Sequence, residues 1–198
     1  MAIPYKKTED PALAERIRRR DPTALRETVR LYLPQILRAA RGAGMDPDAA
    51  EDLAQAVFVT FIEKAHRFEG RSLVRTWLFG ILYRKIAEAR RKQGRDAAMD
   101  DIDTVFEKRF DAAGSWTRPP RAVDAAAYDG ELRREISGCL EQTPEKQRMA
   151  FVLREVEDLG SEEICNILDV TRTNLGVLLM RARNRLRECL ESKGIAKE

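Results

Sequence analysis

The stretch from Thr171 to Arg187 contains five arginines and no acidic side chain, a composition that suits contact with phosphate. The segment before it, residues 161–170, predicts a short helix, a tight turn at Leu168-Asp169-Val170 and a second helix capped by Thr171. Asp169 stands where this turn needs a left-handed backbone, which aspartate tolerates better than most residues. The pattern is typical of a helix-turn-helix, whose second helix reads DNA.

The second helix divides into a buried stripe and a candidate DNA-binding surface. The stripe is a set of apolar residues at helical spacing: Leu175, Leu179, Ala182 and Leu186. Free amides and the dipole at the start of the helix favour phosphate. The residues expected at the DNA are Thr171, Arg172, Thr173, Asn174, Gly176, Val177, Met180, Arg181 and Arg183. We expect Gly176 to allow close approach to the duplex and Val177 to contact a thymine methyl group.

The bulk composition predicts an all-α protein. The 198 residues are 43% hydrophobic and 35% charged, and glycine, threonine and aromatic residues are scarce. No apolar run suits membrane insertion or a secretion signal, so we expect a cytoplasmic location. Cys139, Cys165 and Cys189 are odd in number and widely spaced, and His66 is the only histidine, so we expect neither a disulfide framework nor a zinc site. We also expect no other metal, no cofactor and no small-molecule substrate.

Charge is distributed unevenly along the chain, although the net charge is only +3. Residues 46–63 hold five acids and no base, whereas residues 84–95 hold six bases and one acid. One surface therefore repels DNA and another attracts it. An acidic helix beside a basic one suits a protein that contacts a second protein and a nucleic acid together.

Helix signals divide the chain into two small helical domains. Asp21-Pro22 and Asp46-Pro47 each place a capping carboxylate before a proline at the first helical position. Helical periodicity fails over residues 96–130, where eight acids accompany four bases, which predicts a flexible acidic linker. The expected organisation is an N-terminal extension (1–20), a first domain (21–95), the linker (96–130), a second domain with the helix-turn-helix (131–192) and a tail (193–198).

Five short strings carry a family resemblance. In the first domain they are Ala50-Glu-Asp-Leu-Ala-Gln-Ala-Val-Phe and Phe68-Glu-Gly-Arg-Ser-Leu-Val-Arg-Thr-Trp-Leu. In the second they are Leu140-Glu-Gln-Thr-Pro-Glu-Lys-Gln-Arg, Leu159-Gly-Ser-Glu-Glu-Ile and Arg181-Ala-Arg-Asn-Arg-Leu-Arg. Each string alone is a weak signal, but their order and spacing are specific and cover most of the chain. Together they resemble bacterial RNA polymerase sigma factors of the extracytoplasmic-function group.

The resemblance implies an initiation factor without enzymatic activity. Such a factor binds core RNA polymerase, directs it to specific promoters and helps to melt the DNA. The implied partners are core RNA polymerase, promoter DNA and an anti-sigma factor. The linker is similar to the family's connector, and Asp100, Asp101 and Asp103 are candidates to imitate RNA in a basic channel of the polymerase.

The resemblance also assigns roles to residues. Those that match the polymerase-binding surface are Glu51, Asp52, Gln55 and Phe58. Those that match recognition and melting of the −10 promoter element are Arg67, Phe68, Glu69, Arg71, Ser72, Trp77, Arg84, Lys85, Arg91 and Lys92. The nine residues named above on the second helix match recognition of the −35 element. Two plainer interpretations stay open: Phe58 and Trp77 belong to the core, and the charged residues are merely solvated.

The chain departs from the family at the DNA-reading helix. The family often has lysine and arginine where this sequence has Gly176 and Leu178. The departure affects which DNA sequence is read and leaves the class of protein unchanged.

Two other classes of function remain as alternatives. A stand-alone helix-turn-helix regulator with an N-terminal sensor or dimerisation domain would bind promoter DNA by itself, whereas a sigma factor binds DNA weakly until polymerase is added. A helical enzyme would need a phosphate loop, a Ser/His/Asp set or a metal-ligand cluster, and the sequence has none of them. Glu63 and His66 stand at helical spacing and are better interpreted as a surface pair.

Overall fold

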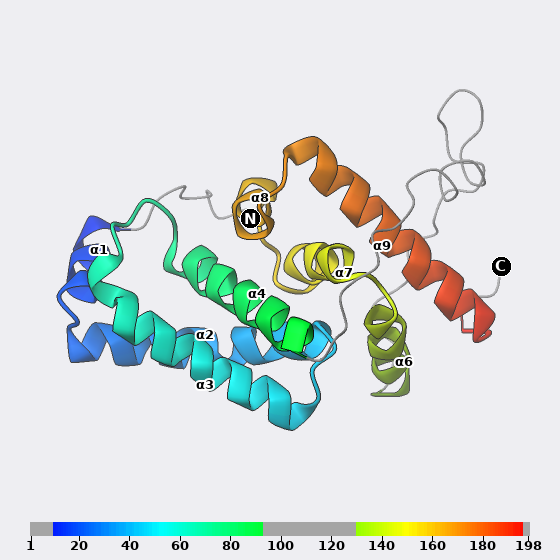
Figure 1. Ribbon diagram of the computed structural model, residues 1–198, viewed down its shortest axis with the longest axis horizontal. Coiled ribbons are helices and arrows are strands. Elements are labelled where there is room, and N and C mark those ends of the chain that lie inside the picture. The colour runs from blue at the N-terminus through cyan, green and yellow to red at the C-terminus, as the bar shows by residue number, and fades with distance from the viewer. Residues whose placement is uncertain (1–9, 93–129, 196–198) are drawn as a thin grey trace.

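The computed structural model describes residues 10–92 and 130–195, and every regular element in these two segments is helical. Figure 1 shows their arrangement. The first segment contains α1 (Pro11–Arg18), α2 (Pro22–Gly42), α3 (Pro47–Lys64), the short 3-10 helix η1 (Ala65–Arg67) and α4 (Val74–Lys92). The second contains α6 (Gly130–Glu141), α7 (Glu145–Phe151), the π-helix η2 (Val152–Val156), α8 (Ser161–Leu168) and α9 (Arg172–Ser192). The all-α expectation is confirmed.

Aspartate and proline together start the first three helices. Asp21 Oδ1 accepts hydrogen bonds from the backbone N–H groups of Thr23 and Ala24 at 2.8 and 3.0 Å, and Asp46 Oδ1 accepts one from Ala49 at 2.8 Å. Because proline at the first helical position has no N–H to satisfy, the pair begins a helix without an unpaired donor. Both predicted helix starts are confirmed. Asp10 caps α1 in the same way, inside the segment predicted to be an N-terminal extension.

The first domain packs α2, α3 and α4 around one core. Its largest fully buried side chains include Ile36, Phe61, Leu78, Phe79 and Leu82. Helix α1 also belongs to this body, because it packs against α2 and η1 and buries Ile17 completely.

The second domain contains the predicted helix-turn-helix. Helix α8 ends at Asp169, whose φ of 53° and ψ of 60° are left-handed. The N–H of Val170 then donates to the carbonyl of Cys165 at 3.1 Å, which closes the turn. Thr171 Oγ1 accepts a hydrogen bond from the N–H of Asn174 at 3.2 Å and so caps α9. The predicted turn, its left-handed aspartate and its threonine cap are all confirmed.

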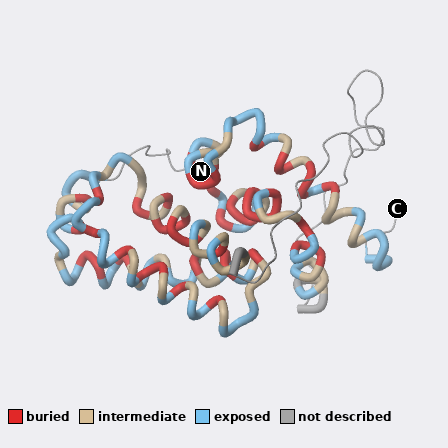
Figure 2. Tube along the Cα trace, in the orientation of Figure 1, coloured by how far each residue is buried: buried red, intermediate tan, exposed pale blue. Residues whose placement is uncertain are grey.

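The two domains lie against one another and share a continuous hydrophobic core. Helix α4 packs on α8, and α2 packs on η2. Buried positions concentrate where these helices meet (Figure 2). The approach is close at Gly42, where an added Cβ would lie 3.0 Å from Cγ2 of Val152. The linker predicted over residues 96–130, including Asp100, Asp101 and Asp103, lies outside the described residues except at Gly130.

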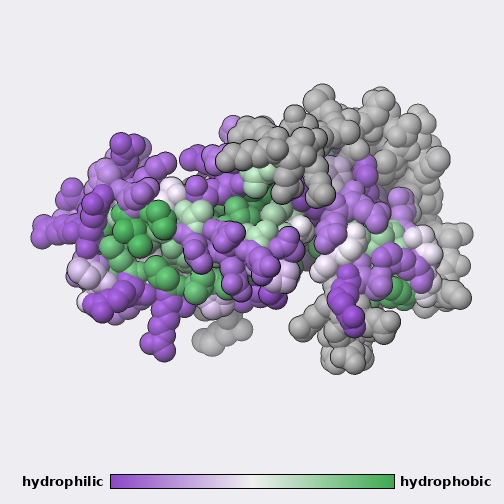
Figure 3. All heavy atoms as spheres, turned by 60° about the horizontal axis from the view of Figure 1, so that its bottom comes forward, coloured by the Kyte–Doolittle hydropathy of each residue, from purple (hydrophilic) through white to green (hydrophobic). Residues whose placement is uncertain are grey.

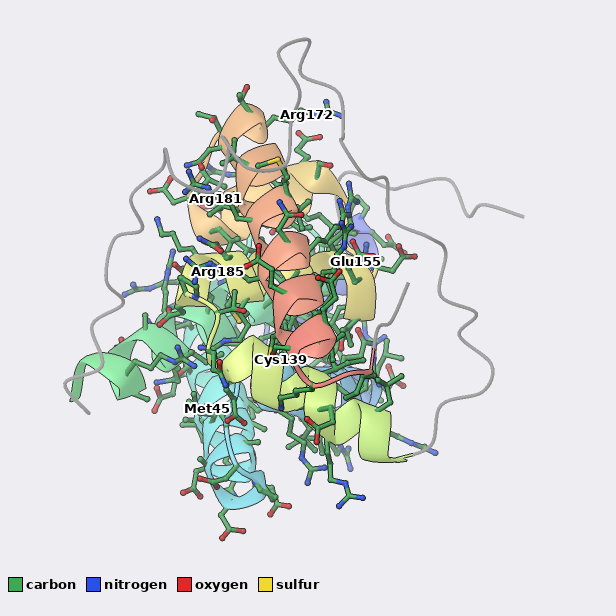
Figure 4. The ribbon with its side chains drawn as sticks, turned by 90° about the vertical axis from the view of Figure 1, so that its right-hand side faces the viewer. Met45, Cys139, Glu155, Arg172, Arg181 and Arg185 are labelled. Atoms are coloured by element: carbon green, nitrogen blue, oxygen red, sulfur yellow. A yellow bond between two sulfur atoms is a disulfide. The ribbon has the colours of Figure 1, made fainter. Side chains whose placement is uncertain are left out.

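A disulfide joins Cys139 on α6 to Cys189 on α9. The expectation that no disulfide framework forms is therefore wrong for this pair. The two cysteines are 50 residues apart in sequence, so spacing alone gives no signal. Helix α6 lies beside the last turns of α9 (Figure 4). This packing brings the Cα atoms of Cys139 and Cys189 to 5.7 Å from one another. Cys165 is free.

Two searches of the described residues concern other kinds of site. None of the described helices is both long enough and apolar enough to cross a membrane. Within residues 10–92 and 130–195, no group of histidine, cysteine and acidic side chains is arranged to hold a metal ion.

Candidate functional site

The outer surface of α3 carries the residues predicted to dock on the polymerase. Glu51, Asp52 and Gln55 are exposed, whereas Phe58 is only 6% exposed and packs in the core. Phe58 thus lies in the hydrophobic core in this structure, as the alternative interpretation of this residue predicted. The acids and the glutamine remain accessible, and no described residue pairs with Glu51 or Asp52.

An apolar patch continues this surface and was missed by the sequence analysis. Val59 and Ile62 on α3 are 55% and 41% exposed, and Leu31 on the neighbouring α2 is 60% exposed. Val59 follows Gln55 by four residues and Ile62 follows it by seven, so both share its helix face. Figure 3 shows apolar atoms gathered on this side of the first domain. The sequence could have predicted this patch, because Val59 and Ile62 recur at helical spacing on the face of α3 that carries Gln55.

An aromatic stack lies beneath the loop predicted to bind the −10 element. Phe68 is 5% exposed, and its ring stacks on that of Trp77 with the centroids 5.0 Å apart and the planes at 13°. Phe61 meets Trp77 edge-on at 5.5 Å. Trp77 is half-buried, so both its core role and a partly accessible ring are seen. Phe68 is not open to a base in this state.

The loop above the stack is tightly folded. Gly70 has a φ of +70°, and an added Cβ would lie 2.9 Å from the Cβ of Ala14 on α1. Glu69 and Arg71 flank it, are exposed and form an ion pair with one another. Arg67 is exposed and Ser72 is half-buried. The loop therefore offers two cations and a carboxylate to solvent above a rigid aromatic base.

Two of the four cations predicted at the basic end of α4 have described side chains. Arg84 is exposed and Lys85 is half-buried. Arg91 and Lys92 lie in the last turn of α4, and their side chains are outside the described part of the structure. Arg90 turns inward, donates from Nη2 to the carbonyl of Ala43 at 2.7 Å and is largely buried.

The start of α9 is the most exposed part of the helix-turn-helix. Its exposed residues are Thr171, Arg172, Thr173, Asn174 and Gly176, and Val177 and Met180 beside them are half-buried. A Cβ added at Gly176 would find no atom within 4 Å, so the position is open to solvent. Arg172 lies at the upper end of α9 in Figure 4.

The later arginines of α9 divide between the inside and the surface. Arg181 is only 8% exposed, so it does not share the exposed face with Arg172. Arg183 is exposed and forms a 2.6 Å ion pair with Glu155 on η2. Of the predicted stripe, Leu175, Leu179 and Ala182 are buried and Leu186 is half-buried, and Leu178 is buried as well.

Three arginines of the first domain contact three glutamates of the second. Arg38 donates from Nε and Nη2 to Glu157 at 3.2 and 2.9 Å, and Arg75 donates in the same way to Glu163 at 3.0 and 2.8 Å. Arg90 Nε lies 3.8 Å from Glu145. The two-point contacts of Arg38 and Arg75 fix both the distance and the angle between these arginines and their glutamates. The sequence analysis assigned no role to these six residues.

Glu163 is the most heavily bonded of these acids. Its side chain is 5% exposed and accepts hydrogen bonds from the Thr76 hydroxyl at 2.7 Å and the Gly160 N–H at 3.0 Å, in addition to those from Arg75. Burial acts differently on Glu157, whose pKa is raised above the ordinary value of 4.5 because desolvation outweighs the favourable contact with Arg38.

Comparison with known proteins identifies the family. Residues 28–96 match Sigma-70 region 2, and residues 133–186 match Sigma-70 region 4. Over 155 residues the chain is 34% identical to a probable RNA polymerase sigma factor of Haemophilus influenzae, covering 74% of this chain and 79% of that protein. It is 26% identical to the ECF RNA polymerase sigma factor SigM of Bacillus subtilis, over 87% of this chain and 98% of that one. The chain belongs to the extracytoplasmic-function (ECF) sigma factors.

Solved structures have the same fold. A structure of CnrH in complex with the cytosolic domain of CnrY matches with a TM-score of 0.67 and 19% identity, over 92% of this chain and 97% of that one. The sigma factor RpoE of Bartonella quintana, crystallised with the anti-sigma factor NepR, matches with a TM-score of 0.63 and 24% identity, over 84% and 96%. As a sigma factor, the protein binds core RNA polymerase and directs transcription initiation at specific promoters.

Proposed function

We propose that the outer surface of α3 is the polymerase-docking surface of this sigma factor. The observation that carries this proposal is that one helix exposes two kinds of side chain. The carboxylates of Glu51 and Asp52 have no partner among the described residues, and the apolar side chains of Val59 and Ile62 are exposed beside them. Carboxylates on a fixed helix suit arginine partners, and an adjoining apolar patch supplies the dry centre that stable interfaces need. Gln55 lies between the two sets.

We assign promoter contacts to the two exposed cationic surfaces. Residues 171–174 at the start of α9 place Arg172 beside helix-terminal amides, an arrangement that suits phosphate and base-edge contacts with the −35 duplex. Arg67, Arg71 and Arg84 suit the −10 element. Stacking an extruded base on an aromatic ring stabilises it by about 1–3 kcal/mol, so binding itself drives melting once Trp77 or Phe68 becomes accessible.

These assignments require the two domains to separate. A short path connects the −10 loop to the start of α9 when the domains are packed together. It runs four residues from Ser72 to Thr76, crosses the 2.7 Å hydrogen bond from the Thr76 hydroxyl to Glu163, and runs eight residues from Glu163 to Thr171. A fully extended chain of ~3.5 Å per residue then limits the distance from the loop to α9 to about 50 Å. Two duplex elements that are two helical turns apart are separated by about 70 Å. The form in which the two domains pack together, the closed form, cannot hold elements at that separation, so we propose that polymerase binds an open form.

The remaining assignments follow from the family. We propose that residues 21–95 and 131–192 act as separate functional units in the cytoplasm, without catalysis or a cofactor. We also propose regulation by an anti-sigma factor, because the Bartonella relative was crystallised with one. Binding promoter DNA only with polymerase would distinguish this protein from a stand-alone regulator.

The first test compares two charge reversals in purified full-length protein. Asp52→Arg should weaken binding to core polymerase by at least about tenfold, or about 1.4 kcal/mol, because it places a cation against cationic partners. Glu191→Arg makes the same charge change at an exposed position near the end of α9 and should leave affinity unchanged. Affinity is measured by fluorescence anisotropy, and activity by run-off transcription from the promoter upstream of the protein's own gene. Equal affinities for the two variants would disprove the docking assignment.

A further inference from the structure

The disulfide between Cys139 and Cys189 occupies a specific place in the second domain. It joins α6, the first described helix after the region predicted to be a linker, to the last turns of α9, the helix predicted to read DNA. One turn further along both helices, Lys193 Nζ lies 2.5 Å from Glu135 Oε2. The two contacts form one seam between α6 and the end of α9.

Helix α6 contacts α9 and α2, but few of its side chains are fully buried. It has 12 residues, and of those whose burial is described only Cys139 and Leu140 are buried. Its C-terminal end is fixed, because Arg148 Nη1 donates to the carbonyls of Leu140 and Glu141 at 3.2 and 3.1 Å. A helix of this length is marginal in water without tertiary support. The cysteine pair is the covalent contact among those that dock α6 along α9.

The two cysteine residues differ in exposure. Cys139 is 2% exposed, whereas Cys189 is partly exposed. An external thiolate reaches Sγ of Cys189, forms a mixed disulfide there and releases Cys139 as a thiolate. A second external thiolate then frees Cys189 and leaves as part of an external disulfide. In the reverse direction the Cys189 thiolate attacks the external disulfide, and Cys139 resolves the mixed disulfide, so two electrons pass to the external pair.

The cellular compartment decides whether this disulfide is stable or transient. RNA polymerase and promoter DNA lie in the bacterial cytoplasm, where glutathione and thioredoxin keep most thiols reduced. Disulfides in that compartment are usually transient and sense redox state. A structural role would instead require the bond to resist the cellular thiol pool.

We propose that Cys139 and Cys189 form a reversible redox site, oxidised by low-molecular-weight disulfides and reduced by low-molecular-weight thiols, that controls the docking of α6 on the recognition helix α9. The oxidised form holds α6 and the end of α9 together, and reduction releases α6 along its length. The inference rests on the proposed cytoplasmic location for its compartment and on no other part of the proposed function. Thiol counting on the purified chain can therefore fail while polymerase docking succeeds, and the reverse is also true.

The test equilibrates the full-length protein with glutathione and glutathione disulfide at graded ratios. After alkylation of the unfolded protein, intact mass should show one modified cysteine, Cys165, at oxidising ratios and three at reducing ratios, with full reversal. Hydrogen exchange of residues 132–138 should accelerate by about tenfold on reduction, because these amides open more readily, while α3 stays unchanged. The Cys165→Ser variant should retain both responses.

Two further variants separate redox control from loss of structure. Cys139→Ser and Cys189→Ser should each show rapid exchange in α6 at every ratio, while their far-ultraviolet circular dichroism stays that of the reduced native chain. Three outcomes would overturn the proposal: the pair stays reduced at every ratio, glutathione cannot reduce it in the folded chain, or it responds to glutathione while exchange in α6 does not change.

Discussion

On its inner face the first domain presents Arg38, Arg75 and Arg90 to three glutamates of the second domain, whereas on its outer face α3 presents Glu51 and Asp52 to solvent. Both faces are charged, but only the inner charges have partners among the residues that the structure describes. The inner carboxylates are nearly buried, so each needs its partner to offset desolvation. The outer carboxylates keep their hydration and their capacity for a new partner.

The difference suggests that stability and recognition are located on opposite sides of one three-helix body. Removing a charge from the inner face leaves a buried partner behind, and removing one from the outer face leaves only water. Stability measurements can therefore distinguish the faces without any polymerase.

The largest effect is expected at Glu163. Glu163→Ala removes the acceptor for Arg75, Thr76 and Gly160 at once and should lower the free energy of unfolding by about 3 kcal/mol, at the lower end for buried pairs because Arg75 is partly exposed. Glu51→Ala on the outer face should change it by less than about 0.5 kcal/mol. Urea unfolding measures both. A cost for Glu51→Ala equal to that of Glu163→Ala would remove the distinction between the faces.

A smaller effect with a defined pH dependence is expected at Glu157. Because its folded pKa is raised above 4.5, the folded state binds the proton more tightly than the unfolded state. This contribution to stability is present at low pH and is lost as pH rises from 4.5 through the raised pKa. The stability of the native chain minus that of Glu157→Gln should therefore fall across that window. Urea unfolding at graded pH measures the difference, and a difference that rises with pH would show that the contact with Arg38 outweighs burial.

The smallest effect is expected at Gly176, on an exposed surface predicted to bind DNA. Gly176→Ala should raise the free energy of unfolding by about 0.5–1 kcal/mol, because alanine favours helix and its Cβ meets no atom within 4 Å. Transcription should fall if the glycine permits close approach to the duplex. Stability is measured by urea unfolding and promoter use by run-off transcription. Unchanged or improved transcription would mean that the glycine is incidental.

Local features were predictable because they depend on neighbouring residues. Asp21-Pro22 and Asp46-Pro47 start helices by their own chemistry, and Asp169 with Thr171 specifies the turn before α9. The positions of single side chains were less predictable. Phe58 matches a docking motif yet faces inward, because helical spacing also places it beside Phe61 and Val57 in the core.

Contacts between distant segments were not predictable from one sequence. Arg90 belongs to a basic run that reads as a DNA surface, and only the packing of α4 near α7 shows that it points at Ala43 and Glu145. The ion pair of Arg38 with Glu157 joins residues 119 apart. The cysteines of α6 and α9 failed the usual sequence criteria for the same reason, since their approach depends on the fold of the whole second domain.

Gly42 sets how closely α2 can approach η2. With hydrogen as its side chain, it leaves room for Val152 and for no further carbon atom at normal contact distance. Any bulkier residue would push α2 away from η2 and shift the balance toward the open form. A single methyl group at this position could thus change how readily the factor is recruited, without altering any surface that polymerase or promoter touches.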